Sequence, residues 1–291
     1  MINYNPKEWF GLIFQFHKTD TFTKLLRVMV GIALFTLLIC FLEDRYNFIS
    51  RSTTAVHSLL GFVISLLLVF RTNTAYDRWW EGRKQWGALV NISRNLAIKM
   101  SAIIPTDGKG ERDYWVSLIS GYSYAVKEHL RGRSSDSIIE GLDEGLRELI
   151  RDKEHIPNAI ASLMQAQVMS MFRQKEITSE QVITFQQNLD IFTDITGACE
   201  RIKRTPIPYI YSLFIKKFIF IYTITMPFGF VNDFAYLTIP MVVFVFYAMA
   251  SLEVIAEEIE DPFGRDANDL PTDDLVVNIR KHVGEILKAQ E

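Results

Sequence analysis

The sequence predicts an all-α membrane protein, with four transmembrane helices and a helical region outside the membrane. Three observations support this fold class. Apolar residues cluster towards both ends of the chain, most charged residues lie between about residues 71 and 205, and the alternation typical of β-strands is nearly absent. Hydrophobic residues make up 49% of the chain although 22% of the residues are charged, so the apolar side chains are segregated along the sequence.

Four stretches without a charged residue mark the expected membrane helices: Val28–Leu42, Ser52–Phe70, Phe218–Asn232 and Phe234–Leu252. The second and fourth contain 19 residues each, which as α-helix span about 29 Å, close to the hydrocarbon thickness of a bilayer. The first and third contain 15 residues each and need flanking residues to reach across. We therefore expect transmembrane helices 1 and 2 within residues 25–70, and helices 3 and 4 within residues 206–260.

The remaining segments are expected to lie outside the bilayer. Residues 1–24 have aromatic and aliphatic side chains near helical spacing, which is typical of an interfacial segment. No helix-breaking pair follows Arg71, so the second helix is expected to exceed forty residues and to end near Pro105. It would enter a helical region at 71–205, with further helices at roughly 112–130, 137–152, 157–173 and 179–204. A break at Asp261–Gly264 starts the C-terminal segment, residues 261–291.

Charge sets the expected orientation and excludes one class of partner. Lys and Arg are concentrated where residues 1–24, 71–205 and 261–291 meet the predicted membrane helices. The Asn232–Asp233 turn has no basic residue. By the positive-inside rule, both termini and the middle region should be cytoplasmic. The net charge of −3 predicts no nucleic-acid partner.

Three strings in order along the chain carry family information: Ser65–Gly87, Pro206–Tyr211 and Asp261–Asp269. The first contains Asp77–Trp86, where three Trp residues alternate with charges; alone this favours packing and membrane anchoring over a ligand site. Together the strings resemble the bestrophins, especially the bacterial branch, from Asn5 to about Val277. The resemblance implies a homopentameric ion channel in the plasma membrane, the bacterial inner membrane. It also implies no enzymatic activity and no required cofactor, with membrane lipid and small monovalent ions as the other partners.

The resemblance also implies a hydrophobic pore neck at Phe62, Leu66 and Phe70. These residues are spaced i, i+4 and i+8, so they share one helix face. The residues alone would favour a different pore face, the polar stripe of His57, Ser58, Gly61, Ser65 and Thr72. The alternative for that stripe is helix packing through small residues.

A second, cytoplasmic aperture is implied near Ile177–Gln181, and Glu180 is the matched position. Five carboxylates around one axis would attract cations, which predicts a sodium or potassium preference. The alternatives are that Glu180 only complements a helix dipole, or that the protein is a chloride or other anion channel of the same fold.

Calcium is not expected to be needed. In animal bestrophins an acidic run follows the Pro-Phe-Gly, but here it is reduced to Asp266 and Asp269 beside Arg265. Calcium prefers six to eight oxygen ligands, so these two are weak, degenerate metal positions, and a helix stop is the alternative interpretation. Two other hypotheses stay open: a non-conducting scaffold, and a metal-dependent membrane enzyme using Glu257, Glu258, Asp261, Asp266 and Asp269.

Overall fold

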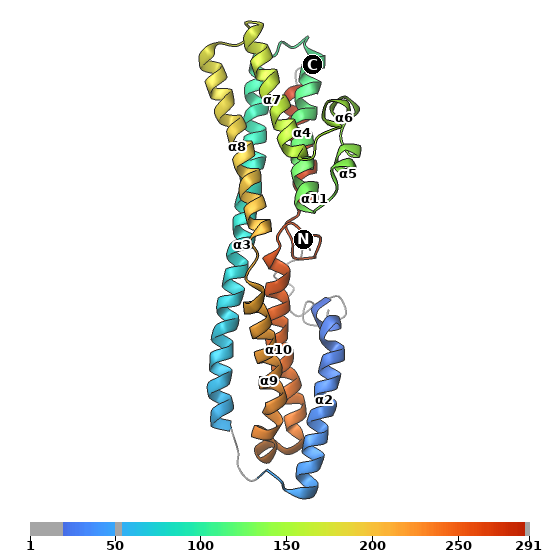
Figure 1. Ribbon diagram of the computed structural model, residues 1–291, viewed down its shortest axis with the longest axis vertical. Coiled ribbons are helices and arrows are strands. Elements are labelled where there is room, and N and C mark those ends of the chain that lie inside the picture. Colours follow the sequence, from blue (N-terminus) through green and yellow to red (C-terminus); the bar gives the residue numbers. More distant parts are fainter. Residues whose placement is uncertain (1–19, 50–53, 289–291) are drawn as a thin grey trace. The chain divides into compact units, whose positions relative to one another are not determined.

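The computed structural model describes residues 20–49 and 54–288, and within these ranges it contains helices and no strand (Figure 1). The predicted interfacial segment lies mostly outside the described residues, although its last residues belong to the first described helix. The helices are α2 (Asp20–Tyr46), α3 (Thr54–Ile103), α4 (Lys109–Leu130), α5 (Ser135–Glu140), α6 (Glu144–Ile150), α7 (Ile156–Arg173), α8 (Ser179–Arg204), α9 (Tyr209–Phe234), the 3₁₀ helix η2 (Ala235–Leu237), α10 (Thr238–Glu260) and α11 (Thr272–Lys288).

The chain forms two compact units, and α3 contributes to both. One unit contains residues 79–205 and 261–291, and we call it the helical unit. The other contains the described residues up to Arg78 together with Pro206–Glu260, and we call it the apolar unit. The predicted helix that continues beyond Arg71 is confirmed, because α3 is a single helix of 50 residues.

The apolar unit packs α2, α9 and α10 on one another, with the first part of α3 sharing their core. Ile64 and Leu68 of α3 are buried among Ile219 of α9 and Phe246 of α10. Among the described residues, three helical stretches are long and apolar enough to cross a membrane: Thr21–Tyr46, Thr54–Ile103 and Tyr209–Glu260. The third stretch contains both α9 and α10, so a count of four membrane crossings stays a prediction.

The turn between α9 and α10 differs from the sequence expectation. We expected it at Asn232–Asp233, but α9 continues to Phe234 and the chain turns at Ala235, whose φ is 48°. Thr54 Oγ1 donates a hydrogen bond to Gly229 O at 3.0 Å and to Asp233 at 3.2 Å, so the polar end of α9 bonds the start of α3. The Gly229 carbonyl and the Asp233 carboxylate therefore have hydrogen-bond partners although α9 continues to Phe234.

The helical unit is built around α4, which packs against α7 and α11. Tyr122 of α4 is fully buried and donates a hydrogen bond from its hydroxyl to Phe192 O of α8 at 2.7 Å. Arg112, also buried, donates to Ile104 O at 2.6 Å and to Leu287 O at 2.8 Å. One guanidinium therefore satisfies carbonyls at the ends of both α3 and α11, which helix termini otherwise leave unpaired.

Most of the predicted helices in this unit are confirmed. The capping box of Thr178 and Gln181 is present at the start of α8, with both reciprocal hydrogen bonds. The continuous helix expected at 137–152 is wrong. That segment forms α5 and α6, separated at Gly141, where the Tyr124 ring occupies the space that a Cβ atom would need.

Candidate functional site

The predicted neck residues lie on a face of α3 that the chain itself leaves uncovered. Phe62, Leu66 and Phe70 are 68%, 45% and 55% exposed. Ile64 and Leu68, about half a helical turn away, are buried in the apolar unit. One side of α3 therefore packs within the chain, while the opposite side presents three large apolar side chains one turn apart.

Two residues of the polar stripe on α3, His57 and Gly61, pack against α9 within the chain. His57 is buried, and its ring lies 6.0 Å from that of Tyr222 and 5.9 Å from that of Phe230 on α9. A Cβ on Gly61 would come within 2.7 Å of the Tyr222 hydroxyl, so the absence of a side chain permits this approach. Ser65 Oγ donates to Gly61 O of its own helix at 2.7 Å. These contacts favour helix packing for His57 and Gly61, whereas Ser58 and Ser65 are exposed and bond only to their own helix.

Glu180 lies in the first turn of α8 and is fully exposed. Its pKa is lowered by a hydrogen bond with the Thr178 side chain, then by its own backbone and by Ser179, so the carboxylate is charged at neutral pH. Ile177, the aliphatic residue of the same segment, is buried. Of these two side chains, only Glu180 is therefore available to face a conduit.

The loop after α10 uses its acidic residues to close a turn. Asp269 is buried and accepts a hydrogen bond at Oδ2 from the Asp266 backbone N at 2.6 Å. A Cβ on Gly264 would lie 2.6 Å from the same oxygen, so the carboxylate fits closely against this glycine. Trp79 Nε1 donates to Asn268 O at 3.0 Å, which fixes the loop to α3. This arrangement favours the helix stop over a calcium clasp.

The acidic cluster proposed for an enzyme is divided among basic partners. Glu257 pairs with Lys216 at 2.9 Å, Glu258 with Lys24 at 3.2 Å, and Asp261 with Lys203 at 2.6 Å. These lysines lie on α9, α2 and α8, so each of the three carboxylates is neutralised by a different helix. Lys216 thus has an ion-pair partner at its place in α9.

A buried arginine joins α3 to the end of α10. Arg71 is 1% exposed, and its Nη2 lies 2.7 Å from Glu260 Oε2. Glu260 Oε1 also accepts a hydrogen bond from Ile207 N at 2.7 Å, just before α9. Glu253, also buried, lies 3.5 Å from Arg71 Nε. A buried guanidinium needs such partners, because an uncompensated charge there is costly.

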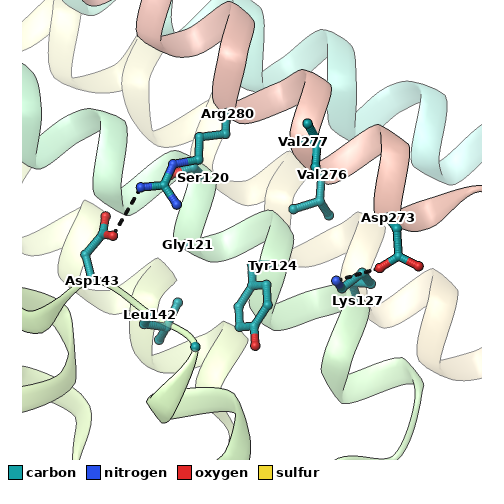
Figure 2. A pocket seen from close by; sticks show the side chains of 11 residues that line it. Ser120, Gly121, Tyr124, Lys127, Leu142, Asp143, Asp273, Val276, Val277 and Arg280 are labelled. Atoms are coloured by element: carbon teal, nitrogen blue, oxygen red, sulfur yellow. Dashed lines mark hydrogen bonds and ion pairs between the residues drawn. The ribbon is translucent and has the colours of Figure 1, made fainter.

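A cavity of about 310 Å³ lies beside α4 and α11, and Tyr124, Lys127, Asp143, Asp273 and Arg280 are among its lining residues (Figure 2). Its charges are already paired across the wall. Arg280 lies 3.3 Å from Asp143, and Lys127 donates to Asp273 at 2.8 Å. The cavity therefore offers little unpaired charge for recognition of an ionic ligand.

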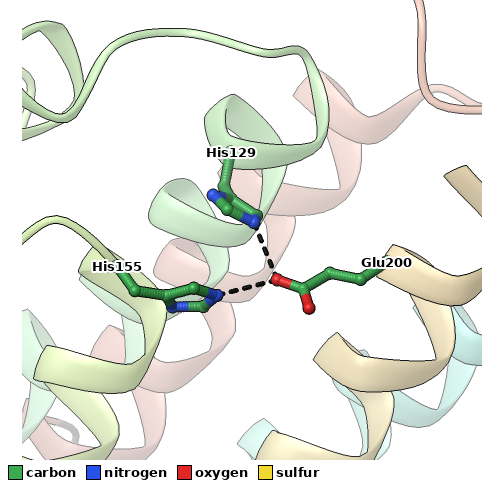
Figure 3. Close-up of side chains that lie close together, drawn as sticks. All are labelled: His129, His155 and Glu200. Carbon is green, nitrogen blue, oxygen red and sulfur yellow. Dashed lines mark hydrogen bonds and ion pairs between the residues drawn. The ribbon is translucent and has the colours of Figure 1, made fainter. Parts of the chain in front are cut away.

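Sequence reasoning missed a cluster formed by His129, His155 and Glu200 (Figure 3). Both histidine Nε2 atoms lie 2.7 Å from Glu200 Oε1. Burial raises the pKa of Glu200, but the hydrogen bonds from His155 and His129 outweigh it and leave the pKa lowered. In the sequence these histidines are 71 and 45 residues from Glu200, so no local motif could have indicated the cluster.

Comparison with known proteins agrees with this architecture. The family model described as Bacterial/Fungal Bestrophin protein matches residues 1–285. The chain belongs to the bestrophin family. This bestrophin is 33% identical over 285 residues to a voltage-dependent anion channel-forming protein of Nostoc sp. strain PCC 7120, covering 96% of this chain and 92% of the relative. It is 29% identical to the protein of the same description from Escherichia coli K12, covering 94% and 90%.

Solved structures show the same fold. A crystal structure of a bacterial bestrophin homologue from Klebsiella pneumoniae matches with a TM-score of 0.83 at 26% identity, covering 90% of this bestrophin and 98% of that chain. The resemblance drawn from the three sequence strings is thus confirmed, and the protein is a helical membrane protein of an ion-channel family. Since the family consists of channels and not enzymes, the metal-dependent enzyme hypothesis is set aside.

Proposed function

We propose that this bestrophin assembles as a homopentamer in which five α3 helices surround an ion-conducting pore. The observation that supports it is the division of α3 into a packed face and a face with Phe62, Leu66 and Phe70 exposed. Five copies around one axis would make each residue a ring, and apolar rings can gate a pore by dewetting. Membrane lipid would cover the outer surface of the apolar unit.

We further propose the bacterial inner membrane as its location, with both termini and residues 71–205 on the cytoplasmic side. The support is the concentration of Lys and Arg on that side and the Asn232–Asp233 turn without a basic residue. In this orientation α8 and Glu180 belong to the cytoplasmic part of the conduit.

For the permeant ion, the support is divided. Relatives from cyanobacteria and enterobacteria are described as anion channel-forming proteins, which favours chloride or another small anion. The predicted cation preference finds no support in these comparisons. It stays as a second candidate because Glu180 is exposed and charged, and a carboxylate ring would oppose anions. We propose anion conduction as the first candidate.

Reversal potentials measured in a potassium chloride gradient across bilayers containing the purified protein test both candidates. A value near the chloride equilibrium potential supports anion conduction, and one near that of potassium overturns it in favour of the second candidate. No conductance in repeated reconstitutions would refute the channel itself and favour the scaffold hypothesis.

Substitution of Glu180 separates the aperture from the ion choice. If Glu180 lines the conduit, Glu180→Gln should shift the reversal potential towards chloride and Glu180→Lys should shift it further. Glu144→Gln, in the exposed first turn of α6, is the matched control and should change nothing. Equal reversal potentials for all variants would show that Glu180 faces away from the ion path.

We also propose that conduction needs no calcium. Asp269 already accepts a hydrogen bond from the Asp266 backbone within the turn, and Arg265 adds a positive charge nearby. Ion flux into liposomes should therefore be equal in chelator and in added calcium. Flux that is lost in chelator and restored by micromolar calcium would contradict this proposal.

A further inference from the structure

Three helices of the helical unit each bring one metal-ligand side chain to the same point. His129 lies in the last turn of α4, His155 is the N-cap residue of α7, and Glu200 lies near the end of α8 (Figure 3). Their ligand atoms all lie within 4.8 Å of one another. Within the described part of the chain, this is the one group of three His, Cys, Asp or Glu residues that converges in this way.

We propose that His129 Nε2, His155 Nε2 and a Glu200 carboxylate oxygen bind a divalent transition-metal ion of the zinc class. Two imidazoles and one carboxylate form a three-ligand set that zinc accepts, with a water molecule in the fourth position. Magnesium and calcium prefer all-oxygen sites, so this donor set selects against them.

The cluster is open enough for an ion to enter. The side chains of His129, His155 and Glu200 are 22%, 32% and 21% exposed, so each is partly buried yet reaches solvent. Partial exposure also leaves room for the water molecule that completes the coordination. The burial of the remaining surface holds the three side chains in place before the ion binds.

Metal binding requires a small expansion of the cluster. Each Nε2 is now 2.7 Å from Glu200 Oε1, which is hydrogen-bonding distance. Ligand atoms around a tetrahedral zinc ion are roughly 3.3 Å apart, given bonds of about 2.0–2.1 Å. A rotation of the long Glu200 side chain can supply this difference, since its carboxylate has a second oxygen to offer.

One existing hydrogen bond competes with the ion. His155 Nδ1 accepts from the Asn158 backbone N at 3.2 Å, which caps α7 and leaves the proton on Nε2. Coordination through Nε2 moves that proton to Nδ1 and removes the cap. A single N-cap contributes far less free energy than a three-ligand zinc site, so the ion wins this competition.

Calorimetric titration of tag-free, chelator-stripped full-length protein with zinc chloride tests the proposal. We expect one zinc ion per chain, no binding of magnesium, and a tetrahedral cobalt absorption spectrum when cobalt replaces zinc. Zinc should also raise the melting temperature, because the ion joins three helices. Wild-type protein that binds no zinc, or binds magnesium equally well, would overturn the proposal.

Two variants remove ligands with little damage to the fold. His155→Asn keeps an N-cap acceptor for α7 but has no Nε2 ligand, and Glu200→Gln keeps a hydrogen-bond acceptor but loses the charge. Each should weaken zinc binding by at least about tenfold, the lower limit for losing even an indirect partner of a metal ligand. His282→Asn, at a histidine outside the cluster, is the matched control and should bind zinc normally. Unchanged affinity in both ligand variants would show that zinc binds elsewhere.

Discussion

At the scale of single residues, the informative side chains are those that the chain leaves without intramolecular packing. Phe62, Leu66 and Phe70 are exposed on a helix whose opposite face is closely packed. Each could be lined by lipid, by water or by a neighbouring subunit. Their spacing of one turn is what five symmetric copies would need to form successive rings.

Truncation of the neck should increase conduction. In Phe62→Ala, Leu66→Ala or Phe70→Ala, each subunit loses one large apolar side chain from the ring. The pore therefore widens, and water is expelled from it less readily. Single-channel conductance in planar bilayers should rise severalfold. Ser58→Ala and Ser65→Ala are the controls, since both hydroxyls bond only to carbonyls of their own helix in this structure. Larger effects from the serine variants would show that the pore face is rotated by about 100° around α3 from the one proposed.

The residues of the candidate sites differ in how far the sequence could predict them. The neck was predicted through family resemblance alone, because the predicted membrane span within α3 is apolar nearly all round and its few polar residues favour a different face. The turn formed by Asp266 and Asp269 was predicted as one of two alternatives. The cluster at Glu200 was not predicted, because only tertiary packing brings residues from three helices together.

At the scale of helices, length and charge pattern predicted most of the fold. The continuation of α3 beyond Arg71 follows from the absence of helix breakers, and the start of α8 follows from its capping box. The division of α5 from α6 was missed although Gly141 and Asp143 both mark it, one as C-cap and one as N-cap. Local sequence signals this weak do not determine where a helix ends. Packing determines it, here the packing of Tyr124 against Gly141.

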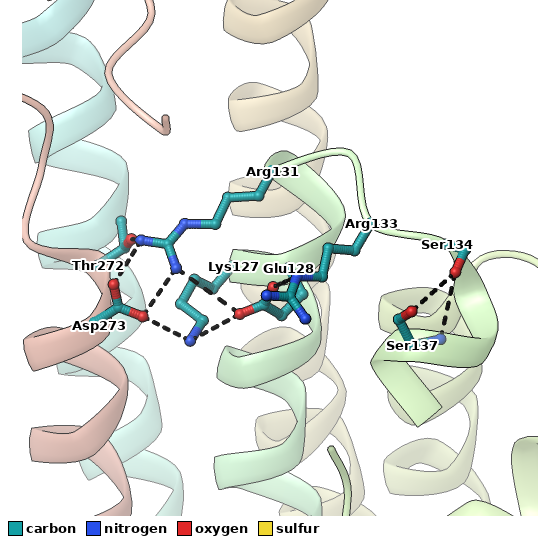
Figure 4. Close-up of polar contacts among 8 residues, drawn as sticks. All are labelled: Lys127, Glu128, Arg131, Arg133, Ser134, Ser137, Thr272 and Asp273. Atoms are coloured by element: carbon teal, nitrogen blue, oxygen red, sulfur yellow. Dashed lines mark hydrogen bonds and ion pairs between the residues drawn. The ribbon is translucent and has the colours of Figure 1, made fainter. Parts of the chain in front are cut away.

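One carboxylate of α11 pairs with two basic side chains at the end of α4. Asp273, in the first turn of α11, binds Arg131 with both oxygens at 2.9 and 2.7 Å, and Lys127 at 2.8 Å (Figure 4). The hydrogen bond with Arg131 is the main cause that holds the pKa of Asp273 far below its usual range, and Lys127 adds to it. A carboxylate with a lowered pKa stabilises the folded state above its unfolded pKa and loses that contribution as the pH falls.

Asp273→Asn should therefore lower stability at neutral pH and make less difference in acid. Because the carboxylate is mostly exposed, the loss should be about 1 kcal/mol or less after solvent screening. The difference in melting temperature should stay constant down to about the ordinary pKa of aspartate and shrink only below it. Thermal melts of both proteins across this range measure it, with Asp274→Asn as the control on the same turn. A difference that is as large in acid as at neutral pH would contradict the ion-pair explanation.

At the scale of the whole molecule, a single chain leaves too much apolar surface uncovered for a protein that is partly in water. In the helical unit, Trp80 and Ile98 of α3 and Ile183 and Ile191 of α8 are all exposed. Ile183 and Ile191 are eight residues apart, so they share one face of α8. If this unit is cytoplasmic, lipid cannot cover these residues, and burial against neighbouring subunits is the alternative.

The last prediction is that the protein is a pentamer whose assembly depends on this face. Burying each side chain should contribute about 1 kcal/mol, since about half of its area is still accessible, and five subunits multiply the gain. Ile183→Glu would place five carboxylates in the interface, where desolvation opposes assembly. Light scattering in detergent should therefore give five chains per particle for wild type and smaller particles for Ile183→Glu.

Leu149→Glu is the matched control. Leu149 is similarly exposed but lies on α6, away from α3 and α8 in the sequence, and its variant should remain pentameric. A monodisperse wild-type monomer would refute the assembly, whereas a pentamer unaffected by Ile183→Glu would show that the subunits meet through other surfaces.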